Sequence, residues 1–363
     1  MENNELLLKV NASSCYEVKI KRGIFSSLGD ELRSLFPNSS FAVITDDIVD
    51  SLYGNEIEEI LSSSNLRFSK FVFKNGEGSK TLATAERIYS FLNESSMTRG
   101  DVIISLGGGI VSDLAGFVAS SYLRGIKFIN IPTTLLSMVD ASVGGKTGVN
   151  TSFGKNQVGA FWQPSLVLID SNFLKSLPKD IFEDGIAEII KYGVISDKVI
   201  LDMLSCGEEN LSSRLEEIIY RSIKIKKDVC QEDEKDNGKR MMLNFGHTIA
   251  HAIEAHSSHR ISHGKAVAIG MVMIEGLLGY FEDEFREKNP VRDKISSLCW
   301  LYNLPTEYKA NILELFEIIK SDKKRKNDEI TIVLSREIGS CFLKSISLET
   351  LKQALEEVFK NIN

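Results

Sequence analysis

Hydrophobic and polar positions follow two different periods along the 363-residue chain, and the period changes near the middle. In the first half, short apolar runs typical of buried strands alternate with longer stretches in which apolar residues recur at helical spacing. The predicted strands cover residues 41–45, 68–73, 102–106, 126–131 and 166–169, and the predicted helices cover 51–62 and 81–92. Strands that alternate with helices of this length favour parallel pairing, so this half predicts a doubly wound, Rossmann-like α/β domain.

The second half is different, because from about residue 180 the apolar spacing is mostly that of helices. The predicted helices cover residues 181–195, 208–229, 248–256, 265–278, 291–301 and 348–359, and only 329–334 and 340–344 look extended. The charge run at 320–327 predicts a solvated loop. Pro178 interrupts the pattern between the halves, so we predict an α/β domain over residues 1–177 and a mainly α-helical domain over 178–363.

Composition and charge exclude several classes of protein. The chain has 43 basic and 50 acidic residues, a net charge of 43 − 50 = −7, so a general nucleic-acid binder is not expected. Hydrophobic residues make up 43%, too many for a disordered chain. We find no apolar run long enough to span a membrane and no secretory signal at the N-terminus. The five cysteines lie far apart and are odd in number, which predicts free thiols and a reducing cytoplasm.

A glycine-rich turn follows the strand predicted at 102–106. Residues 107–109 are all glycine, and Asp113 lies in the helix that the turn opens. Glycines let the backbone approach a ligand, and the start of a helix attracts a pyrophosphate. Three further polar groups lie at the ends of other predicted strands: Asp46, Glu77 with Lys80, and Thr133 with Thr134. With the turn they make four clusters. Together they predict a dinucleotide site at one sheet edge; the alternative is a tight strand-to-helix turn.

Residues 139–159 form a glycine-rich stretch with no helical or strand period. Lys146, Lys155 and Asn156 are embedded in it. A P-loop would need glycine five positions before Gly145, where the chain has Asp140, so an ATPase is not indicated. We expect a loop whose lysines bind phosphate or carboxylate; the alternative is a flexible surface loop.

All five histidines fall between positions 247 and 263. His247 and His251 are four residues apart on one helical face, and His263 opens the next predicted helix. Two imidazoles and a carboxylate suit a catalytic divalent metal ion, and Glu188, in an otherwise apolar helix beside Lys191, is the candidate carboxylate. Spacing alone does not decide which two of the three histidines bind metal, although the i, i+4 pair His247 and His251 is the first choice that helical spacing offers. The alternative is a set of histidines satisfied at a helix–helix contact, which is the favoured interpretation for His256 and His259.

Eight stretches of the chain together resemble the 3-dehydroquinate synthase family. They are NGEGSK at 75–80, GGGIVSDLAGF at 107–117, YLRG at 122–125, IPTTLLSMVDASVGGKTGVN at 131–150, GKNQVGAF at 154–161, AEIIKYG at 187–193, LNFGHTIAHAIE at 243–254 and SHGKAVAIGM at 262–271. The chain differs from the usual motifs of the family at Thr151, Ala250 and Lys265. Lys265 changes the charge near the expected metal. The resemblance implies a homodimer with an N-terminal NAD-binding domain and a C-terminal metal-binding domain.

The resemblance also implies the residues of the site. A divalent metal ion, Zn²⁺ or Co²⁺, would be held by Glu188, His247 and His263, with His251 facing the substrate. The NAD residues would be Asp46, Glu77, Lys80, Gly108, Gly109, Asp113, Thr133, Thr134, Lys146, Lys155, Phe173, Leu174, Lys175 and Ser176. Substrate groups would be Asp140, Lys146, Lys155, Asn156, Lys191, Lys226, Arg240, Asn244 and His251, with Arg124 of the partner subunit on the phosphate. A lysine of the run 322–325 would join them, and we favour Lys323.

The family converts 3-deoxy-D-arabino-heptulosonate 7-phosphate, a sugar-acid phosphate, to 3-dehydroquinate and phosphate. Lys226, Arg240 and Asn244 form the group set expected for its carboxylate, which related sugar phosphate cyclases do not have to bind. The alternatives are such a cyclase, a metal- and NAD-dependent polyol dehydrogenase, and a non-catalytic metal- or nucleotide-binding module. A simple polyol oxidation does not need the phosphate-binding residues Arg124, Lys155 and Asn156.

Overall fold

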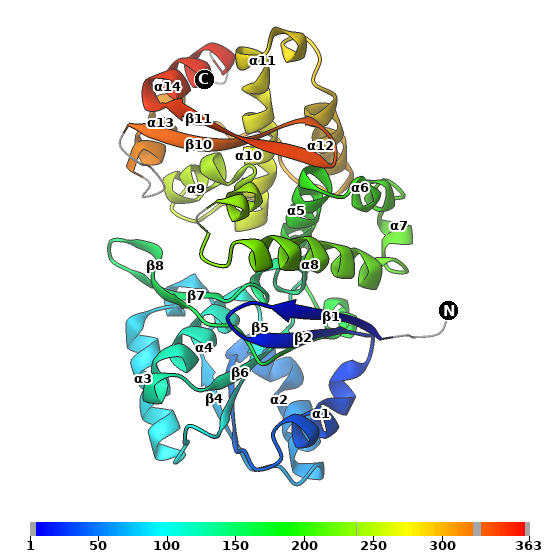
Figure 1. Cartoon of the computed structure of the whole chain (residues 1–363), viewed down its shortest axis with the longest axis vertical. Helices are drawn as coiled ribbons and strands as arrows, with labels where there is room; N and C mark the ends of the chain where they lie inside the picture. The colour runs from blue at the N-terminus through cyan, green and yellow to red at the C-terminus, as the bar shows by residue number, and fades with distance from the viewer. Residues whose placement is uncertain (1–4, 237, 322–327, 360–363) are drawn as a thin grey trace. The chain divides into compact units, whose positions relative to one another are not determined.

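The chain forms two compact units. The computed structural model describes residues 5–236, 238–321 and 328–359 (Figure 1). The first unit comprises Met1–Pro178 with Lys226–Lys235, and the second comprises Lys179–Ile225 with Asp236–Asn363. The return of Lys226–Lys235 to the first unit is a tertiary contact that chain order did not predict.

A seven-stranded sheet organises the first unit. Its strands are β1 (Leu6–Asn11), β2 (Cys15–Ile20), β3 (Phe41–Asp46), β4 (Phe68–Phe73), β5 (Val102–Gly107), β6 (Lys127–Pro132) and β9 (Leu166–Ile169). The order is β1-β2-β9-β6-β5-β3-β4, and only β1 and β2 pair antiparallel. Every residue of β3, β5 and β9 is buried, as expected of strands covered on both faces. The predicted parallel α/β architecture is therefore present, with an antiparallel edge that we did not predict.

Helices cover both faces of this sheet. They are α1 (Leu28–Leu35), α2 (Asp47–Ser63), α3 (Leu82–Glu94) and α4 (Gly109–Ser121). α1 packs against α2, and α3 packs against α4. Side chains begin two of them: the carboxylate of Asp46 accepts from the N–H groups of Ile48 and Val49, and the hydroxyl of Thr81 accepts from Thr84 N–H. The Asp46 cap therefore starts α2 directly at the carboxyl end of β3, whereas α3 starts only after a 3₁₀ turn at Glu77–Ser79.

The glycine-rich stretch at 139–159 is not the loop that we expected. It contains a π-helical turn (Ser137–Ala141) and an antiparallel ribbon of β7 (Lys146–Thr151) and β8 (Gly154–Phe161). Gly148 and Gly159 face each other in this ribbon, and a Cβ on Gly159 would lie 2.2 Å from the Thr147 carbonyl oxygen. Backbone pairing between glycines leaves no apolar alternation, which is why the pattern did not reveal the strands.

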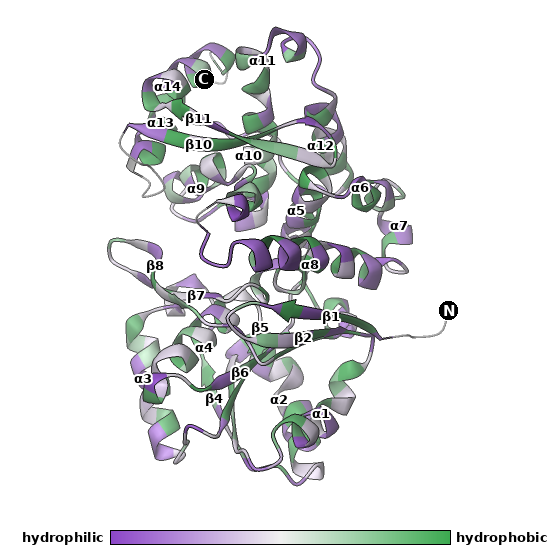
Figure 2. Cartoon of the chain, in the orientation of Figure 1, coloured by the Kyte–Doolittle hydropathy of each residue, from purple (hydrophilic) through white to green (hydrophobic). Residues whose placement is uncertain are grey.

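The second unit is mainly helical, as predicted. Its helices are α5 (Lys179–Ile195), α6 (Lys198–Leu204), α7 (Glu208–Leu211), α8 (Leu215–Glu232, whose end belongs to the first unit), α9 (His247–His256), α10 (His263–Gly276), α11 (Leu278–Phe281), α12 (Pro290–Leu301), α13 (Ile312–Ser321) and α14 (Leu348–Val358). The single helix predicted at 208–229 is broken into α7 and α8 by a turn at 212–214, in which the Ser213 hydroxyl donates to the Asn210 carbonyl oxygen. β10 (Glu329–Glu337) and β11 (Ser340–Ser347) form the predicted extended pair, and hydrophobic colour follows much of β10 (Figure 2).

Helix α10 is the apolar centre of this unit. Together with α11 it forms the one segment of the described residues, His263–Phe281, that is long and apolar enough to cross a membrane. The expectation that no apolar run is long enough is therefore wrong for this segment. However, 78% of it is buried within the protein, as in the core helix of a soluble protein. All five cysteines are described and none forms a disulfide, as predicted.

Candidate functional site

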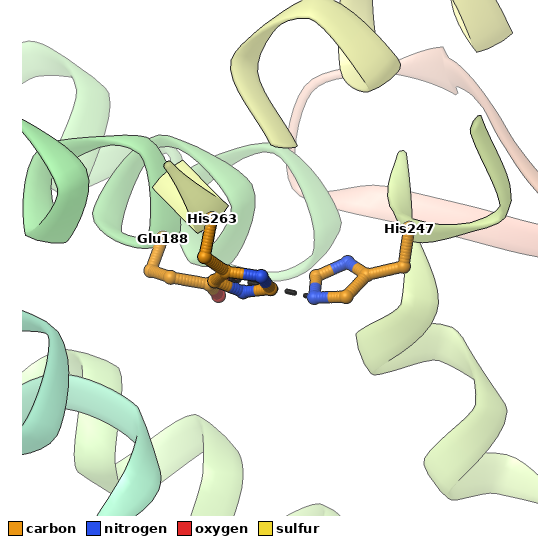
Figure 3. Close-up of side chains that lie close together, drawn as sticks. All are labelled: Glu188, His247 and His263. Carbon is orange, nitrogen blue, oxygen red and sulfur yellow. Dashed lines mark hydrogen bonds and ion pairs between the residues drawn. The ribbon is translucent and has the colours of Figure 1, made fainter. Parts of the chain in front are cut away.

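Three side chains of the second unit converge on one point, each from a different helix (Figure 3). Glu188 Oε1 lies 3.4 Å from His247 Nε2 and 3.2 Å from His263 Nε2. One donor atom of each residue lies within 4.8 Å of the others. A tetrahedral ion with bonds of about 2.0–2.1 Å holds its ligand atoms roughly 3.4 Å apart, so this donor set can hold a divalent metal.

Close backbone packing sets the positions of these residues. Glu188 lies within α5, whereas His247 and His263 begin α9 and α10. A Cβ on Gly264 would lie 2.3 Å from the Asp184 Cα, so glycine lets the first turn of α10 touch α5. A Cβ on Gly270 would lie 2.2 Å from the Gly246 carbonyl oxygen, which brings α9 against α10. Glycines thus hold three helices close enough for their ligands to meet.

The electrostatics of the cluster favour a charged carboxylate. Burial opposes ionisation of Glu188, but the Lys191 ammonium and the two histidines outweigh it and hold the carboxyl pKa well below its usual range. Burial, followed by the charge of Lys191, lowers the pKa of His247. Burial also acts to lower the pKa of His263, but hydrogen bonds and charges from Glu188 and Glu254 overcome it and raise the pKa to about 10. Glu188 is therefore an anion ready to bind a cation.

The remaining histidines lie outside this cluster. The ring of His251 stands edge-on to that of His247, with centroids 5.5 Å apart, and the group of possible ligands does not include it. Helical spacing paired His247 with His251, but the packing of α10 brings His263 to His247 instead. His256 contacts the Tyr308 hydroxyl and Glu314, and His259 is exposed. This agrees with the non-ligand interpretation of His256 and His259.

Most of the predicted nucleotide residues of the first unit follow the carboxyl ends of its sheet strands, whereas Lys146 and Lys155 lie in the β7–β8 ribbon. Gly108 precedes α4 without a capping side chain, and it and Gly109 are partly exposed. A Cβ on Gly108 would lie 3.1 Å from the Thr134 side chain, so the turn is a cradle that a larger residue would fill. Asp46 caps α2 and also accepts from the Asn75 amide, so its carboxylate has a structural role as well. The turn can accept a pyrophosphate.

A polar network lies beside this turn. The buried Lys80 ammonium contacts the carboxylate of Asp113 and lies 2.6 Å from Asn156 Oδ1. Glu77 accepts from the Asn150 amide at 2.6 Å and lies 4.0 Å from Lys155 Nζ. The network therefore joins residues predicted to bind NAD with residues predicted to bind the substrate phosphate. Asn150 is a member that the sequence analysis did not single out.

Other predicted residues are placed as follows. Lys226 Nζ lies 3.0 Å from Asp140 Oδ2 within the first unit. Phe173 packs edge-on against Tyr53, whose hydroxyl contacts Ser176. Arg240 and Thr133 are buried, whereas Arg124 and Lys146 are exposed. Asn244 is the last residue of a 3₁₀ segment at Lys239–Asn244, and Leu174 and Lys175 are the last two of another at Ser171–Lys175. Lys323 lies outside the described residues. Glu254 and Asp184 were not predicted from the sequence; their only signal is an acid on the same helix as a ligand, α9 and α5 respectively.

Comparison with known proteins identifies the family. Residues 70–184 match the family described as 3-dehydroquinate synthase N-terminal, and residues 185–325 match 3-dehydroquinate synthase C-terminal. The 3-dehydroquinate synthase of Streptococcus mutans is 43% identical over 347 residues, which cover 94% of this chain and 97% of that protein. This chain belongs to the 3-dehydroquinate synthase family. The resemblance predicted from the motifs is confirmed.

Solved structures extend the likeness of this 3-dehydroquinate synthase family member to its fold. A 2-deoxy-scyllo-inosose synthase, solved with carbaglucose-6-phosphate, NAD⁺ and Co²⁺, matches with a TM-score of 0.86 and 24% identity over 97% of this chain and 100% of that one. The 2-epi-5-epi-valiolone synthase of Streptomyces hygroscopicus, solved with NAD⁺ and Zn²⁺, matches with a TM-score of 0.86 and 24% identity over 97% and 99%. The predicted fold class is confirmed.

Proposed function

We propose that this chain is a 3-dehydroquinate synthase that converts 3-deoxy-D-arabino-heptulosonate 7-phosphate to 3-dehydroquinate and inorganic phosphate. The observation that carries the proposal is the convergence of Glu188, His247 and His263 in a chain that belongs to this family. The same proposal makes the protein a lyase, because its net reaction eliminates phosphate without net oxidation.

We assign the metal ion, Zn²⁺ or Co²⁺, to Glu188, His247 and His263. The fit rests on the donor chemistry, one carboxylate oxygen and two imidazole nitrogens, and on separations of 3.2 and 3.4 Å that suit tetrahedral coordination. Three protein ligands leave a coordination position for substrate. Imidazole and carboxylate ligands do not separate zinc from cobalt, so either ion is consistent with the site.

We assign NAD to the first unit, at the turn before α4. The fit rests on the glycine cradle beside Thr134, which offers backbone N–H groups at a helix start. The residues proposed to bind it are Asp46, Glu77, Lys80, Gly108, Gly109, Asp113, Thr133, Thr134, Lys146, Lys155, Phe173, Leu174, Lys175 and Ser176. The contact of Lys80 with Asp113 supports their acting together, because it fixes both side chains beside the turn.

When bound, NAD would supply a hydride acceptor that is restored at the end of the reaction, and a metal held by Glu188, His247 and His263 would supply a Lewis acid for the substrate oxygens. The chain's own residues then bind, orient and move protons. Lys155 and Arg124 of the partner subunit neutralise the leaving phosphate, and the Asn156 amide donates a hydrogen bond to it. His251 exchanges protons with substrate oxygens during ring opening and aldol closure. Asp140, Lys146 and Lys191 orient the substrate; Lys323 has the same proposed role.

Specificity for a carboxylated substrate is assigned to Lys226, Arg240 and Asn244. Two cations and an amide are the group set that a carboxylate requires. The alternative, a cyclase for an uncarboxylated sugar phosphate, has no need of this set. Comparison of the heptulosonate phosphate with glucose 6-phosphate as substrates separates the two: we expect turnover of the first only.

The main experiment is stoichiometric. Metal-loaded protein is incubated with NAD⁺ and the heptulosonate phosphate, and phosphate, NADH and the carbocycle are followed together. We expect one phosphate and one carbocycle per substrate without accumulation of NADH. Accumulation of NADH without phosphate release would instead establish the polyol dehydrogenase alternative.

The family resemblance also leads us to propose a homodimer in the cytoplasm. A homodimer would supply Arg124 to the phosphate across subunits. Light scattering of the purified protein tests the assembly, and loss of activity on dilution below the dimer dissociation constant tests its link to function.

A further inference from the structure

The first turn of α10 is fixed in the second unit before any metal binds. Asp184, one turn before Glu188 on α5, accepts a hydrogen bond of 2.6 Å from the Ser262 hydroxyl and one of 3.3 Å from Lys265 N–H. These two donors flank His263, and the close approach of Gly264 to Asp184 adds a steric constraint. The backbone of His263 therefore has little freedom, and rotation of its ring is the main variable left.

Glu254 restricts that remaining rotation. It lies on α9, two turns after His247, and only 6% of it is exposed. Its Oε2 lies 3.4 Å from His263 Nδ1, slightly longer than a typical N–H···O hydrogen bond. An ionised carboxylate can only accept, so this contact requires a proton on Nδ1. The same rule applies to Nε2, which lies 3.2 Å from Glu188 Oε1 and carries a proton until a metal ion replaces it. Glu254 then keeps the proton on Nδ1, so the Nε2 lone pair is the one left for the ion.

The two histidine ligands are therefore held differently. His247 directs Nδ1 at the Phe245 carbonyl oxygen, 3.1 Å away, which selects the same tautomer through a neutral acceptor. His263 uses a charged acceptor, which makes its ring the more basic ligand. In consequence, α5 and α9 each supply one metal ligand, Glu188 and His247. Each also supplies an acid that contacts the start of α10, Asp184 from α5 and Glu254 from α9.

We propose that Glu254 is a positioning residue that orients His263 and fixes its tautomer for metal binding. This inference rests on the proposed metal centre and adds to it a fourth residue that does not touch the ion. Partners of this kind typically contribute 10–100-fold to metal affinity. The Glu254→Gln side chain keeps the size but presents a neutral acceptor, so it resembles the environment of His247.

The test measures binding of Co²⁺ to the metal-stripped full-length protein, by its visible absorption and by competition with a chelator. We expect Glu254→Gln to weaken Co²⁺ binding about 10–100-fold and to change the absorption spectrum of the bound ion. The matched control is Glu275→Gln, a fully buried carboxylate on α10 whose contacts are Asn289 and Ser335. The control should bind Co²⁺ as the unmodified protein does, and NAD⁺ affinity should not change in either variant.

The outcomes separate this inference from the proposed function. Co²⁺ binding by Glu254→Gln that matches the unmodified protein in affinity and spectrum overturns the role of Glu254 and leaves the metal centre intact. Failure of the unmodified protein to bind Co²⁺ overturns the metal centre itself. If Glu254→Gln does not fold, Glu254→Asp carries the same expectation of weaker binding, because it keeps the charge but withdraws the carboxylate from His263.

Discussion

The ammonium of Lys191 contacts the carboxylate of Glu188 one turn earlier on α5, and both side chains are almost completely buried. A buried carboxylate costs several kcal/mol unless a charge compensates it. In the metal-free protein, Lys191 supplies that compensation, and it is the largest favourable influence on ionisation of Glu188. The cation thus keeps the proposed metal ligand charged before the metal arrives.

Replacing Lys191 by Met should therefore destabilise the metal-free protein more than the metal-bound protein. We expect the free energy of unfolding to fall by about 3–5 kcal/mol in the presence of a chelator, because a buried charge loses its partner. Saturating Zn²⁺ should recover part of this loss. Urea unfolding with and without Zn²⁺ measures both values. Exposed Lys198→Met on α6 is the control, with an expected change within about 0.5 kcal/mol.

Gly264→Ala should separate α10 from α5. The added Cβ would lie 2.3 Å from Asp184 Cα and 2.4 Å from its carbonyl oxygen, and neither backbone atom can move alone. We expect a loss of about 1–3 kcal/mol in stability and a weaker metal site, because His263 moves with the backbone. Thermal unfolding and Co²⁺ titration measure the two effects. Gly100→Ala, whose nearest atom is 3.8 Å away, should change neither; full metal affinity in Gly264→Ala would contradict the steric argument.

Much of the fold could be predicted because its signals are local. Parallel strands such as β5 are continuous apolar runs, and helices such as α5 repeat at 3.6 residues, so both are visible in the sequence. The β7–β8 ribbon was missed, since paired glycines such as Gly148 carry no hydrophobic signal. Helix α13 and the edge strands β1 and β2 were not predicted either, although Val10 and Ile20 do mark buried positions of the edge strands.

The candidate site was only partly accessible from sequence for a related reason. Residue types suggested a metal, but helical spacing favoured the pair His247 and His251. The relevant partner, His263, reaches the cluster through the packing of α10 against α5 and α9, which is a tertiary contact. Glu254 was not singled out because an acid at the last position of the 243–254 motif has no local feature that marks it. The family resemblance, not spacing, supplied the ligand set.

The second histidine ligand beside His247 is His263 in the proposed metal site and His251 in the pair that helical spacing favours. These two assignments predict opposite effects of replacing His263 or His251 by alanine. The metal affinity of His263→Ala should fall by more than the roughly 10–100-fold expected when only a residue that hydrogen-bonds to a ligand is removed. His251→Ala should keep its metal but lose turnover by about 10²–10⁴-fold, as expected for loss of proton transfer. Metal analysis after gel filtration, together with phosphate release, measures both. Loss of metal from His251→Ala alone would restore the pair favoured by helical spacing.

Glu275 is a fully buried carboxylate on α10 that lies outside the proposed metal site. Its carboxylate accepts from Ser335 N–H at 2.8 Å and from the Asn289 amide at 3.2 Å. Burial raises the pKa of Glu275 to about 7, although these two hydrogen bonds act in the opposite direction. The folded protein therefore retains a proton on this group at pH values where the unfolded chain has lost it.

This raised pKa predicts how stability depends on pH. Between the ordinary value of 4.5 and about 7, the folded state binds more protons than the unfolded state, so stability falls as pH rises. Glu275→Gln cannot ionise and should escape this loss. We expect the difference in unfolding free energy, variant minus unmodified, to rise by about 2–3 kcal/mol from pH 5 to pH 8. Urea unfolding of both proteins at each pH measures it, and all other ionisable groups cancel in the difference. A difference that is constant with pH would mean that Glu275 is already ionised in the folded protein at pH 5.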